Sequence, residues 1–223
     1  MEKEFRIFAQ NLAYYNEGYL VGGWIDLPQT QENIKKYLKD IVKIDEEHEE
    51  YEIADVDNVP FEYSCIQWAS VQDVNNLAII YSTLDKFQRA ALETHLNCNG
   101  TDRYGITELI NICLQVDEIS YYEYNFDGIE NSQYLSAESK MGYTMAEENG
   151  LYADLDRKGI LDYFDFEKYG ENYGYDYELS EDGYLISDYE IDLKYYSKDE
   201  IQEKVNEILK ENLENKENLN IEI

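Results

Sequence analysis

Proline, cysteine and long apolar runs are scarce in this chain of 223 residues. Only two prolines are present, which excludes a proline-rich linker or polyproline segment. The three cysteines are odd in number and have no CxxC spacing, so a disulfide framework is disfavoured and a reducing, cytoplasmic setting is expected. No stretch approaches the ~18 apolar residues that a membrane-spanning helix needs, and we therefore expect no membrane partner.

Basic side chains are the most consequential shortage. The chain has 18 Lys and Arg against 49 Asp and Glu, a net charge of −31. Like charges repel, so nucleic acid and anionic membranes are excluded as direct partners. The balance favours a basic protein partner, a bound cation or simple solubility.

Apolar and aromatic residues are nevertheless plentiful. They make up 43% of the chain when all hydrophobic types are counted, and 23 residues are tyrosine. A disordered chain of this charge would have few of either. Tyrosine can bury its ring while its hydroxyl stays hydrogen-bonded, so we expect a folded protein with tyrosine-rich cores and a charged surface.

Residues 1–68 have the pattern of a small α+β domain. Its elements are expected in the order strand 5–13, strand 19–27, helix 30–42 and strand 51–56. The turn at 14–18 joins the first two strands as a hairpin, and Thr30 is a good N-cap for the helix.

Residues 69–116 change to helical spacing and predict a small helical domain. Three helices are marked, in order, by the stripe at Val71, Val74, Leu77, Ala78 and Tyr81, by Phe87 with Ala90 to Leu92, and by Leu109, Ile110, Cys113 and Leu114. Thr107 is the expected cap of the third.

Residues 117–195 form the most biased segment, with 21 acidic and 5 basic side chains and dense tyrosine. We expect an acidic α+β domain there. Ser197 and Glu200 then form a capping box that predicts a helix within the C-terminal extension 196–223. The expected fold class is α+β, as three small domains followed by a C-terminal helix.

Three stretches, in this order, carry a family pattern. The first has Tyr15, Asn16 and Gly18 in a turn and Gly22, Trp24, Asp26 and Leu27 in a strand, the second is Asp55 to Pro60, and the third is Leu161 to Gly170. Together they resemble the ArdA family of antirestriction proteins. Two features differ from that family: Glu171 stands where a basic residue is usual, and the chain continues beyond the usual end.

The resemblance implies an elongated, three-part α+β protomer that forms a homodimer. It implies surface carboxylates laid out like the phosphates of bent duplex DNA. The implied partner is a type I restriction-modification enzyme, whose cleavage and modification would be blocked in the cytoplasm of a bacterium receiving a mobile element.

The expected site is a surface and not an active centre. The candidate carboxylates that mimic DNA are Asp45, Glu46, Glu47, Glu49, Glu50, Asp55, Asp57, Asp162, Asp165, Glu167, Glu171, Asp176 and Glu178. The candidate residues of the antirestriction motif and dimer contact are Leu161, Tyr163, Phe164, Phe166, Tyr169, Gly170 and Tyr173. So many aromatic side chains in one short segment favour a contact that covers them.

Two other functions stay open. The chain could inhibit a different DNA-binding defence protein. Residues 154–165 also place acids at positions 1, 3, 9 and 12 and Gly159 at position 6, which is the spacing of a calcium-binding loop, although Lys158 opposes it.

No catalytic residue is expected, because neither His48 nor His95 has a Ser or Cys context that suggests a nucleophile. No cofactor or metal is expected either.

Overall fold

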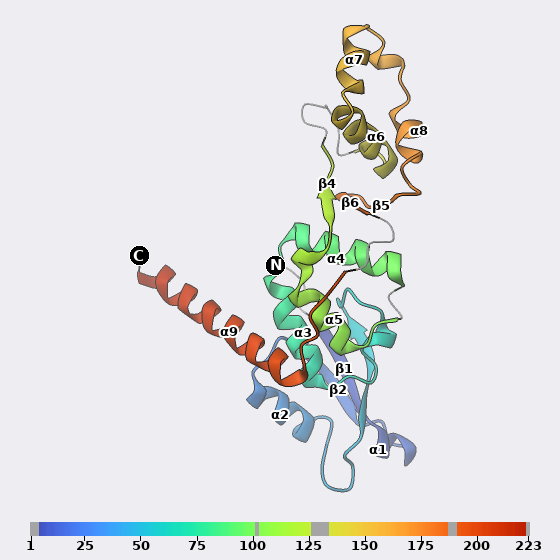
Figure 1. Ribbon diagram of the computed structural model, residues 1–223. Helices are drawn as coiled ribbons and strands as arrows, with labels where there is room; N and C mark the ends of the chain where they lie inside the picture. The colour runs from blue at the N-terminus through green and yellow to red at the C-terminus, as the bar shows by residue number, and fades with distance from the viewer. Residues whose placement is uncertain (1–4, 101–102, 126–133, 187–190, 222–223) are drawn as a thin grey trace. The chain divides into compact units, whose positions relative to one another are not determined.

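The structure is a computed structural model that describes residues 5–100, 103–125, 134–186 and 191–221, with side chains described as far as Glu214 (Figure 1). It is a mixture of helices and two three-stranded sheets, which confirms the α+β class. Contacts divide the chain into two compact units. Unit 1 comprises residues 1–84, 100–114 and 193–223, and unit 2 comprises residues 85–99 and 115–192.

Unit 1 holds the first sheet and the helices that cover one of its faces. In chain order its elements are β1 (Phe5–Asn11), α1 (Leu12–Asn16), β2 (Gly22–Leu27), α2 (Gln31–Asp40), β3 (Tyr51–Asp57), the 3₁₀ helix η1 (Tyr63–Cys65), α3 (Val71–Thr83), α5 (Ile106–Leu114) and α9 (Lys198–Ile221). The strand order is β2-β1-β3, and both pairs are antiparallel.

The expected hairpin pairing is confirmed, with Phe5 opposite Leu27 and Phe8 opposite Trp24. Its connection differs from a simple turn. β1 ends at Asn11 and β2 begins only at Gly22, so both strands are shorter than expected at the turn, and the helical turn α1 lies between them. The side chain of Asn11 causes this, because its Oδ1 accepts hydrogen bonds from the backbone N–H groups of Ala13 and Tyr14 and so caps a helix. Gly18 then returns the chain at φ 91°.

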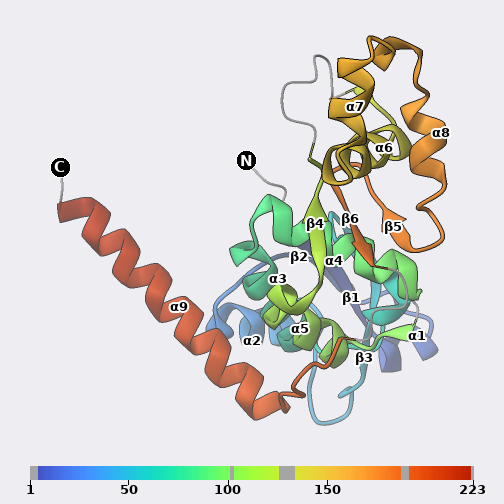
Figure 2. The same cartoon turned by 45° about the horizontal axis from the view of Figure 1, so that its top comes forward.

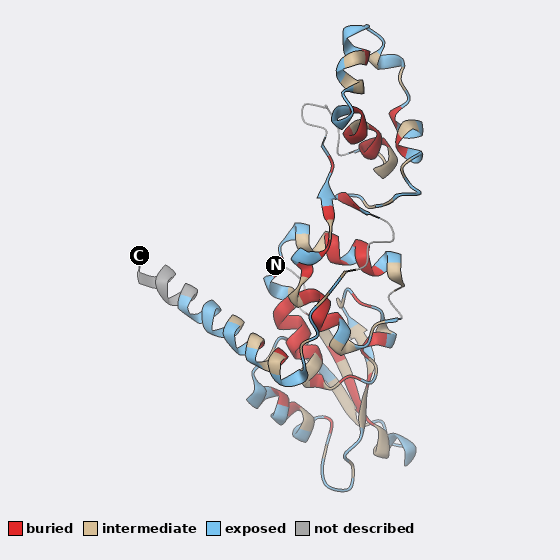
Figure 3. Cartoon of the chain, viewed as in Figure 1, coloured by how far each residue is buried: buried red, intermediate tan, exposed pale blue. Residues whose placement is uncertain are grey.

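The core of unit 1 is largely aliphatic, with Phe5, Tyr37 and Phe61 also buried. Ile7, Leu27 and Ile53 point from the sheet and are fully buried, together with Val74 and Leu77 of α3. Figure 3 shows this buried band running through α3 and the strands. The predicted Thr30 cap is confirmed, since its hydroxyl oxygen accepts the N–H of Asn33 at 3.2 Å.

Helix α9 begins where the capping box predicted. The backbone N–H of Ser197 donates to Glu200 at 2.8 Å, and Lys198 pairs with Asp73 of α3 at 2.9 Å. Ile201 and Val205 are buried, whereas Leu209 is exposed. Figures 1 and 2 both show the later turns of α9 running out beyond α3 and α5.

Unit 2 is built from short elements around a second sheet. They are α4 (Lys86–Asn99), η3 (Val116–Glu118), β4 (Tyr121–Glu123), α6 (Ala137–Glu148), α7 (Leu151–Arg157), η5 (Leu161–Tyr163), α8 (Phe166–Glu171), β5 (Tyr177–Leu179) and β6 (Gly183–Ile186). The strand order is β4-β6-β5, again antiparallel. Tyr124, Met141, Met145 and Tyr184 form one core cluster, which confirms the expected tyrosine-rich interior.

All three helices expected within 69–116 are present as α3, α4 and α5. Helix α5 begins at Ile106, so Thr107 lies inside its first turn and the expected Thr107 cap was wrong. Contacts group α4 with unit 2 and the other two helices with unit 1. The division into three domains at 1–68, 69–116 and 117–195, followed by a C-terminal helical extension at 196–223, stays a prediction.

Candidate partner-binding surface

All thirteen candidate carboxylates are exposed. Seven lie in unit 1, on the loop between α2 and β3 and on β3 itself, and six lie in unit 2, from Asp162 to Glu178. Among the described residues, Asp57 is the one member of this set with a lysine or arginine nitrogen within 4.0 Å. The set therefore offers negative charge that the chain's own Lys and Arg leave almost wholly uncompensated.

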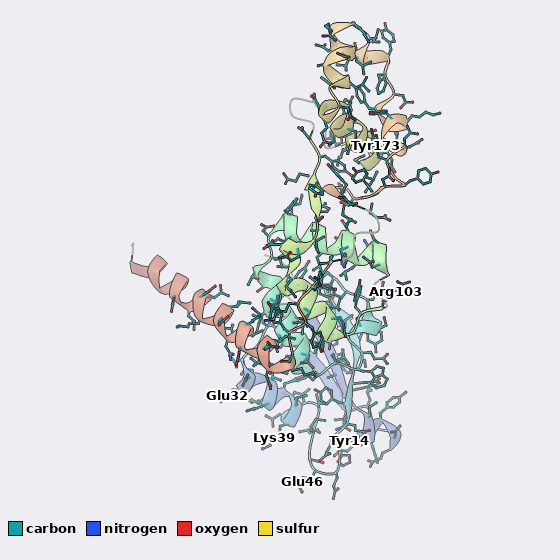
Figure 4. All side chains as sticks on the ribbon, in the orientation of Figure 1. Tyr14, Glu32, Lys39, Glu46, Arg103 and Tyr173 are labelled. Carbon is teal, nitrogen blue, oxygen red and sulfur yellow. The ribbon has the colours of Figure 1, made fainter. Side chains whose placement is uncertain are left out.

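The acidic loop of unit 1, residues 45–50, is tied to the sheet by Asn11. This side chain is fully buried, and its Nδ2 donates to the carbonyl oxygens of His48 at 3.1 Å and Lys43 at 3.4 Å. Its Oδ1 meanwhile caps α1. The buried amide of Asn11 thus holds both the start of α1 and the acidic loop in place. Figure 4 labels Glu46 at the outer end of this loop.

His48 closes the loop on its other side. Its ring stacks on Tyr14 with centroids 4.0 Å apart, and its Nδ1 lies 3.0 Å from Asp45 and its Nε2 3.6 Å from Glu17. The hydrogen bond with Asp45 raises the pKa of His48, and the same bond lowers the pKa of Asp45. These contacts fix the backbone of the loop and the carboxylate of Asp45 before any partner arrives.

The motif segment of unit 2, residues 161–173, packs within that unit. Asp165 caps α8 by accepting the N–H of Lys168 at 3.0 Å, and Phe166 is buried against Tyr143 with ring centroids 3.8 Å apart. Gly170 lies directly against the backbone of Glu138 in α6, where a Cβ would overlap the carbonyl oxygen. The motif spacing is thus explained by one cap, one core ring and one close helix contact.

The aromatic residues of that segment are partly covered within unit 2. Phe166 and Gly170 are buried, and Leu161, Phe164, Tyr169 and Tyr173 are half-buried. Tyr163 is 88% exposed. Packing inside the unit therefore covers most of the apolar surface that had suggested a dimer contact, and the dimer role of the segment stays a prediction that now depends mainly on Tyr163.

Comparison with protein families supplies the deciding observation. The family model described as antirestriction protein, ArdA, matches residues 7–186. The chain belongs to the ArdA family. Comparison with curated proteins finds no match. The match includes the acidic loop of unit 1 and the motif segment of unit 2, whereas α9 lies outside it.

The calcium-loop hypothesis was wrong in its geometry. Helix α7 runs through Asp154 and Asp156, so these acids do not lie on a ligating loop. Asp154 pairs with Arg157, and Asp165 is occupied as a helix cap. Within the described ranges, no group of three or more His, Cys, Asp or Glu side chains is placed to hold a metal ion.

A cavity of about 290 Å³ lies in unit 2 between α4 and the turn from β5 to β6. Glu93, Cys98, Glu178, Glu181 and Asp182 are among its lining residues. Burial, reinforced by the negative charge of Glu178, raises the pKa of the Cys98 thiol to about 12. The thiol therefore stays protonated at neutral pH, which makes it a poor nucleophile.

Two structural residues of this ArdA protein escaped the sequence analysis. Asn11 stands directly before α1, where an N-cap residue is expected, but its bonds to residues 43 and 48 are non-local. Gly142 lies inside a helical pattern, and an isolated glycine there signals a close contact. Among the described residues, no helix is both long and apolar enough to cross a membrane.

Proposed function

We propose that this protein mimics double-stranded DNA, occupies the DNA-binding groove of type I restriction-modification enzymes and blocks both cleavage and modification. Membership of the ArdA family supports the antirestriction role. The observation that carries the mimicry is the exposure of all thirteen candidate carboxylates, of which only Asp57 has a Lys or Arg nitrogen within 4.0 Å in the described part of the chain. A groove built to bind phosphates attracts such a surface.

The amount of charge is sufficient for this role. Two chains would carry twice 31, or 62, net negative charges. At one charge per ~1.7 Å of duplex, that equals the charge on roughly 105 Å of DNA. The backbone of the loop at 45–50 is held by Asn11 and Asp45, which adds to the proposal because a fixed backbone loses less entropy on binding than a mobile one.

We further propose that the acting species is a homodimer in the bacterial cytoplasm, with Leu161–Tyr173 at or beside the dimer contact. The exposed ring of Tyr163 supports this placement. Sedimentation at micromolar concentration should give twice the chain mass. A monomer at that concentration would contradict this part of the proposal.

The decisive experiment titrates purified protein into a type I enzyme and follows DNA cleavage and methylation in parallel. Both activities should fall together at near-stoichiometric amounts, because both use the same groove. Added DNA should compete, and sodium chloride should weaken the inhibition. Inhibition that saturating DNA leaves undiminished would overturn the mimicry.

Variants sharpen this test. Neutralising the four loop glutamates together (E46Q, E47Q, E49Q and E50Q) should weaken inhibition and make it less dependent on salt. Each change removes one charge attraction to the enzyme, and salt weakens such attractions by screening. The single change Asp165→Asn is the matched control, since asparagine keeps the helix cap and only one charge is lost. A single carboxylate change that abolished inhibition of a folded protein would point to a discrete site instead.

A further inference from the structure

One face of the unit 1 sheet is open around Trp24. Ile7, Leu27 and Ile53 point into the core from the other face. At one end of the opposite face, side chains keep large exposed fractions, 40% for Trp24, 42% for Arg6 and 55% for Asp26, whereas Gln10 on the same face is buried beside Glu52. No helix in the described ranges therefore covers the end around Trp24. A tryptophan left this open on a rigid sheet is unusual, because the residue is normally among the more buried types.

Trp24 is held in a fixed position. Phe8 lies opposite it in the strand register and meets it edge-on, with ring centroids 5.6 Å apart. The guanidinium of Arg6 lies 5.1 Å from the indole centre. Arg6 in turn pairs with Asp26 at 2.7 Å and with Asp57 at 3.6 Å. The indole thus belongs to a preorganised network and is not a loose surface ring.

The charge of this face is negative in spite of its arginine. Asp26, Glu52, Asp55 and Asp57 contribute four negative charges and Arg6 one positive charge, which leaves −3. Arg6 engages Asp26 and Asp57, whereas Asp55 has no Lys or Arg nitrogen within 4.0 Å among the described residues. A partly exposed ring beside such a carboxylate matches the planar guanidinium of a partner's arginine, which stacks on rings and pairs with carboxylates at the same time.

We propose that the open face of the β2-β1-β3 sheet is a docking face for an arginine-bearing protein surface, with Trp24 as its aromatic anchor. This rests on the proposed function, in which the arginines belong to a groove that normally holds DNA phosphates. Duplex phosphates offer no aromatic plane. The anchor therefore supplies a contact that DNA lacks and that added salt does not screen.

The test measures the affinity of the full-length protein for the methyltransferase core of a type I enzyme across a series of sodium chloride concentrations. Trp24→Thr should weaken binding roughly tenfold at every salt concentration and leave the salt slope unchanged. Threonine is chosen because it suits a β-strand. Trp24→Phe keeps a ring and should restore most of the affinity.

Trp68→Thr is the matched control, because Trp68 is also in unit 1 and is 70% exposed. It should bind within about twofold of the unaltered protein, as expected for a residue outside the anchoring network. Thermal melts of all variants check that folding is intact. The double change D55N and D57N should have the opposite signature and flatten the salt slope.

Four outcomes would overturn the proposal. Equal losses for Trp24→Thr and Trp68→Thr would show unspecific aromatic contact. Unchanged binding by Trp24→Thr would refute the anchor while leaving the proposed function intact. Self-association that Trp24→Thr abolishes would assign the face to a second copy of the chain. Failure of the unaltered protein to bind the core would remove the proposed function and the anchor together.

Discussion

The two units carry acidic surfaces on different interiors. Unit 1 places its candidate acids on the loop 45–50 and on β3, and its fully buried side chains are mostly Ile, Leu and Val, with Phe5, Tyr37 and Phe61 also buried. Unit 2 places them on η5, α8, the following turn and β5, over core clusters rich in Tyr, Met and Phe. Tyrosine rings bury large areas and still tolerate partial exposure. A region dominated by charge can therefore build a core from side chains that do not need complete burial.

The units also differ in what holds their elements at the correct distance. In unit 1, tyrosine hydroxyls bond to backbone groups of the sheet, as Tyr37 does with Ala9 and Gly23. In unit 2, α6 and α8 touch through the backbone at Gly142 and Gly170. The tyrosine hydroxyl sets the spacing in the first of these contacts, and the absence of a Cβ sets it in the second. Two substitutions test this difference, and a third tests the acidic loop.

The largest effect is expected from Gly170→Ala. The new methyl group would overlap the carbonyl oxygen of Glu138, so α6 and α8 must separate. We expect a loss of about 3 kcal/mol in the free energy of unfolding, at the upper end for overpacked contacts. Denaturant unfolding measures it, and hydrogen exchange should place the loss in unit 2.

Gly174→Ala is the control for that change. It lies in the same unit, and its added Cβ would sit 3.5 Å from the carbonyl oxygen of Glu171, an ordinary contact. It should leave unfolding within about 0.5 kcal/mol of the unaltered protein. Equal losses from both glycine changes would refute the close contact as the cause.

Tyr37→Phe should have the second largest effect. The hydroxyl accepts the N–H of Ala9 at 3.1 Å and donates to the carbonyl oxygen of Gly23 at 2.6 Å, and burial raises its pKa to about 12. Its loss leaves two backbone groups unpaired and should cost about 2 kcal/mol of unfolding free energy. Tyr19→Phe, whose ring is 63% exposed, should change the melting temperature little.

The smallest effect concerns the acidic loop. Asp45→Asn removes the carboxylate that raises the pKa of His48, so that pKa should fall towards its usual value near 6.5. A proton NMR titration of His48 measures the change. Glu49→Gln alters an exposed acid of the same loop and should leave the pKa almost unchanged. An unaltered titration in Asp45→Asn would contradict the hydrogen bond.

The pH dependence of the loop follows from the raised pKa of His48 and the lowered pKa of Asp45. The raised pKa of His48 means that its stabilising contribution is complete below about pH 6.5 and is lost as pH rises through the folded value. The lowered pKa of Asp45 means that its contribution is present above about pH 3.9 and is lost as pH falls through the folded value. The loop should therefore be tightest between about pH 4 and 6.5, which hydrogen exchange of residues 45–50 can follow.

Local features of the fold were predictable from the sequence. The Thr30 cap, the Ser197 capping box and the β1–β2 pairing all depend on residues close together in the chain, so their chemistry can be read directly. The double role of Asn11 was not predictable, because its second set of bonds reaches 37 residues away to His48. The contact between Gly142 and Gly170 likewise joins two helices whose crossing no local pattern encodes.

The sequence predicts that the candidate surface is acidic and exposed. Ionised carboxylates avoid burial, so the exposure of all thirteen acids follows from their chemistry. The order within the surface was not predictable. His48 and Asn11, which are not acidic, fix the loop, and Arg6 sets the position of Trp24. The charge of a sequence predicts an acidic surface, but it does not predict the uncharged or basic residues that hold the acidic loop and Trp24 in place.

The path of the chain through the two units sets the order in which the protein can mature during synthesis. Unit 1 uses residues from both ends of the sequence, and unit 2 is made from residues between them. Asn111 bonds to the backbone N–H and carbonyl of Tyr196, and α3 receives Ile201 and Val205 only once α9 exists. On a ribosome that releases the amino end first, the part begun earliest is completed last. A nascent chain stopped before α9 would expose the apolar side of α3 to chaperones and proteases.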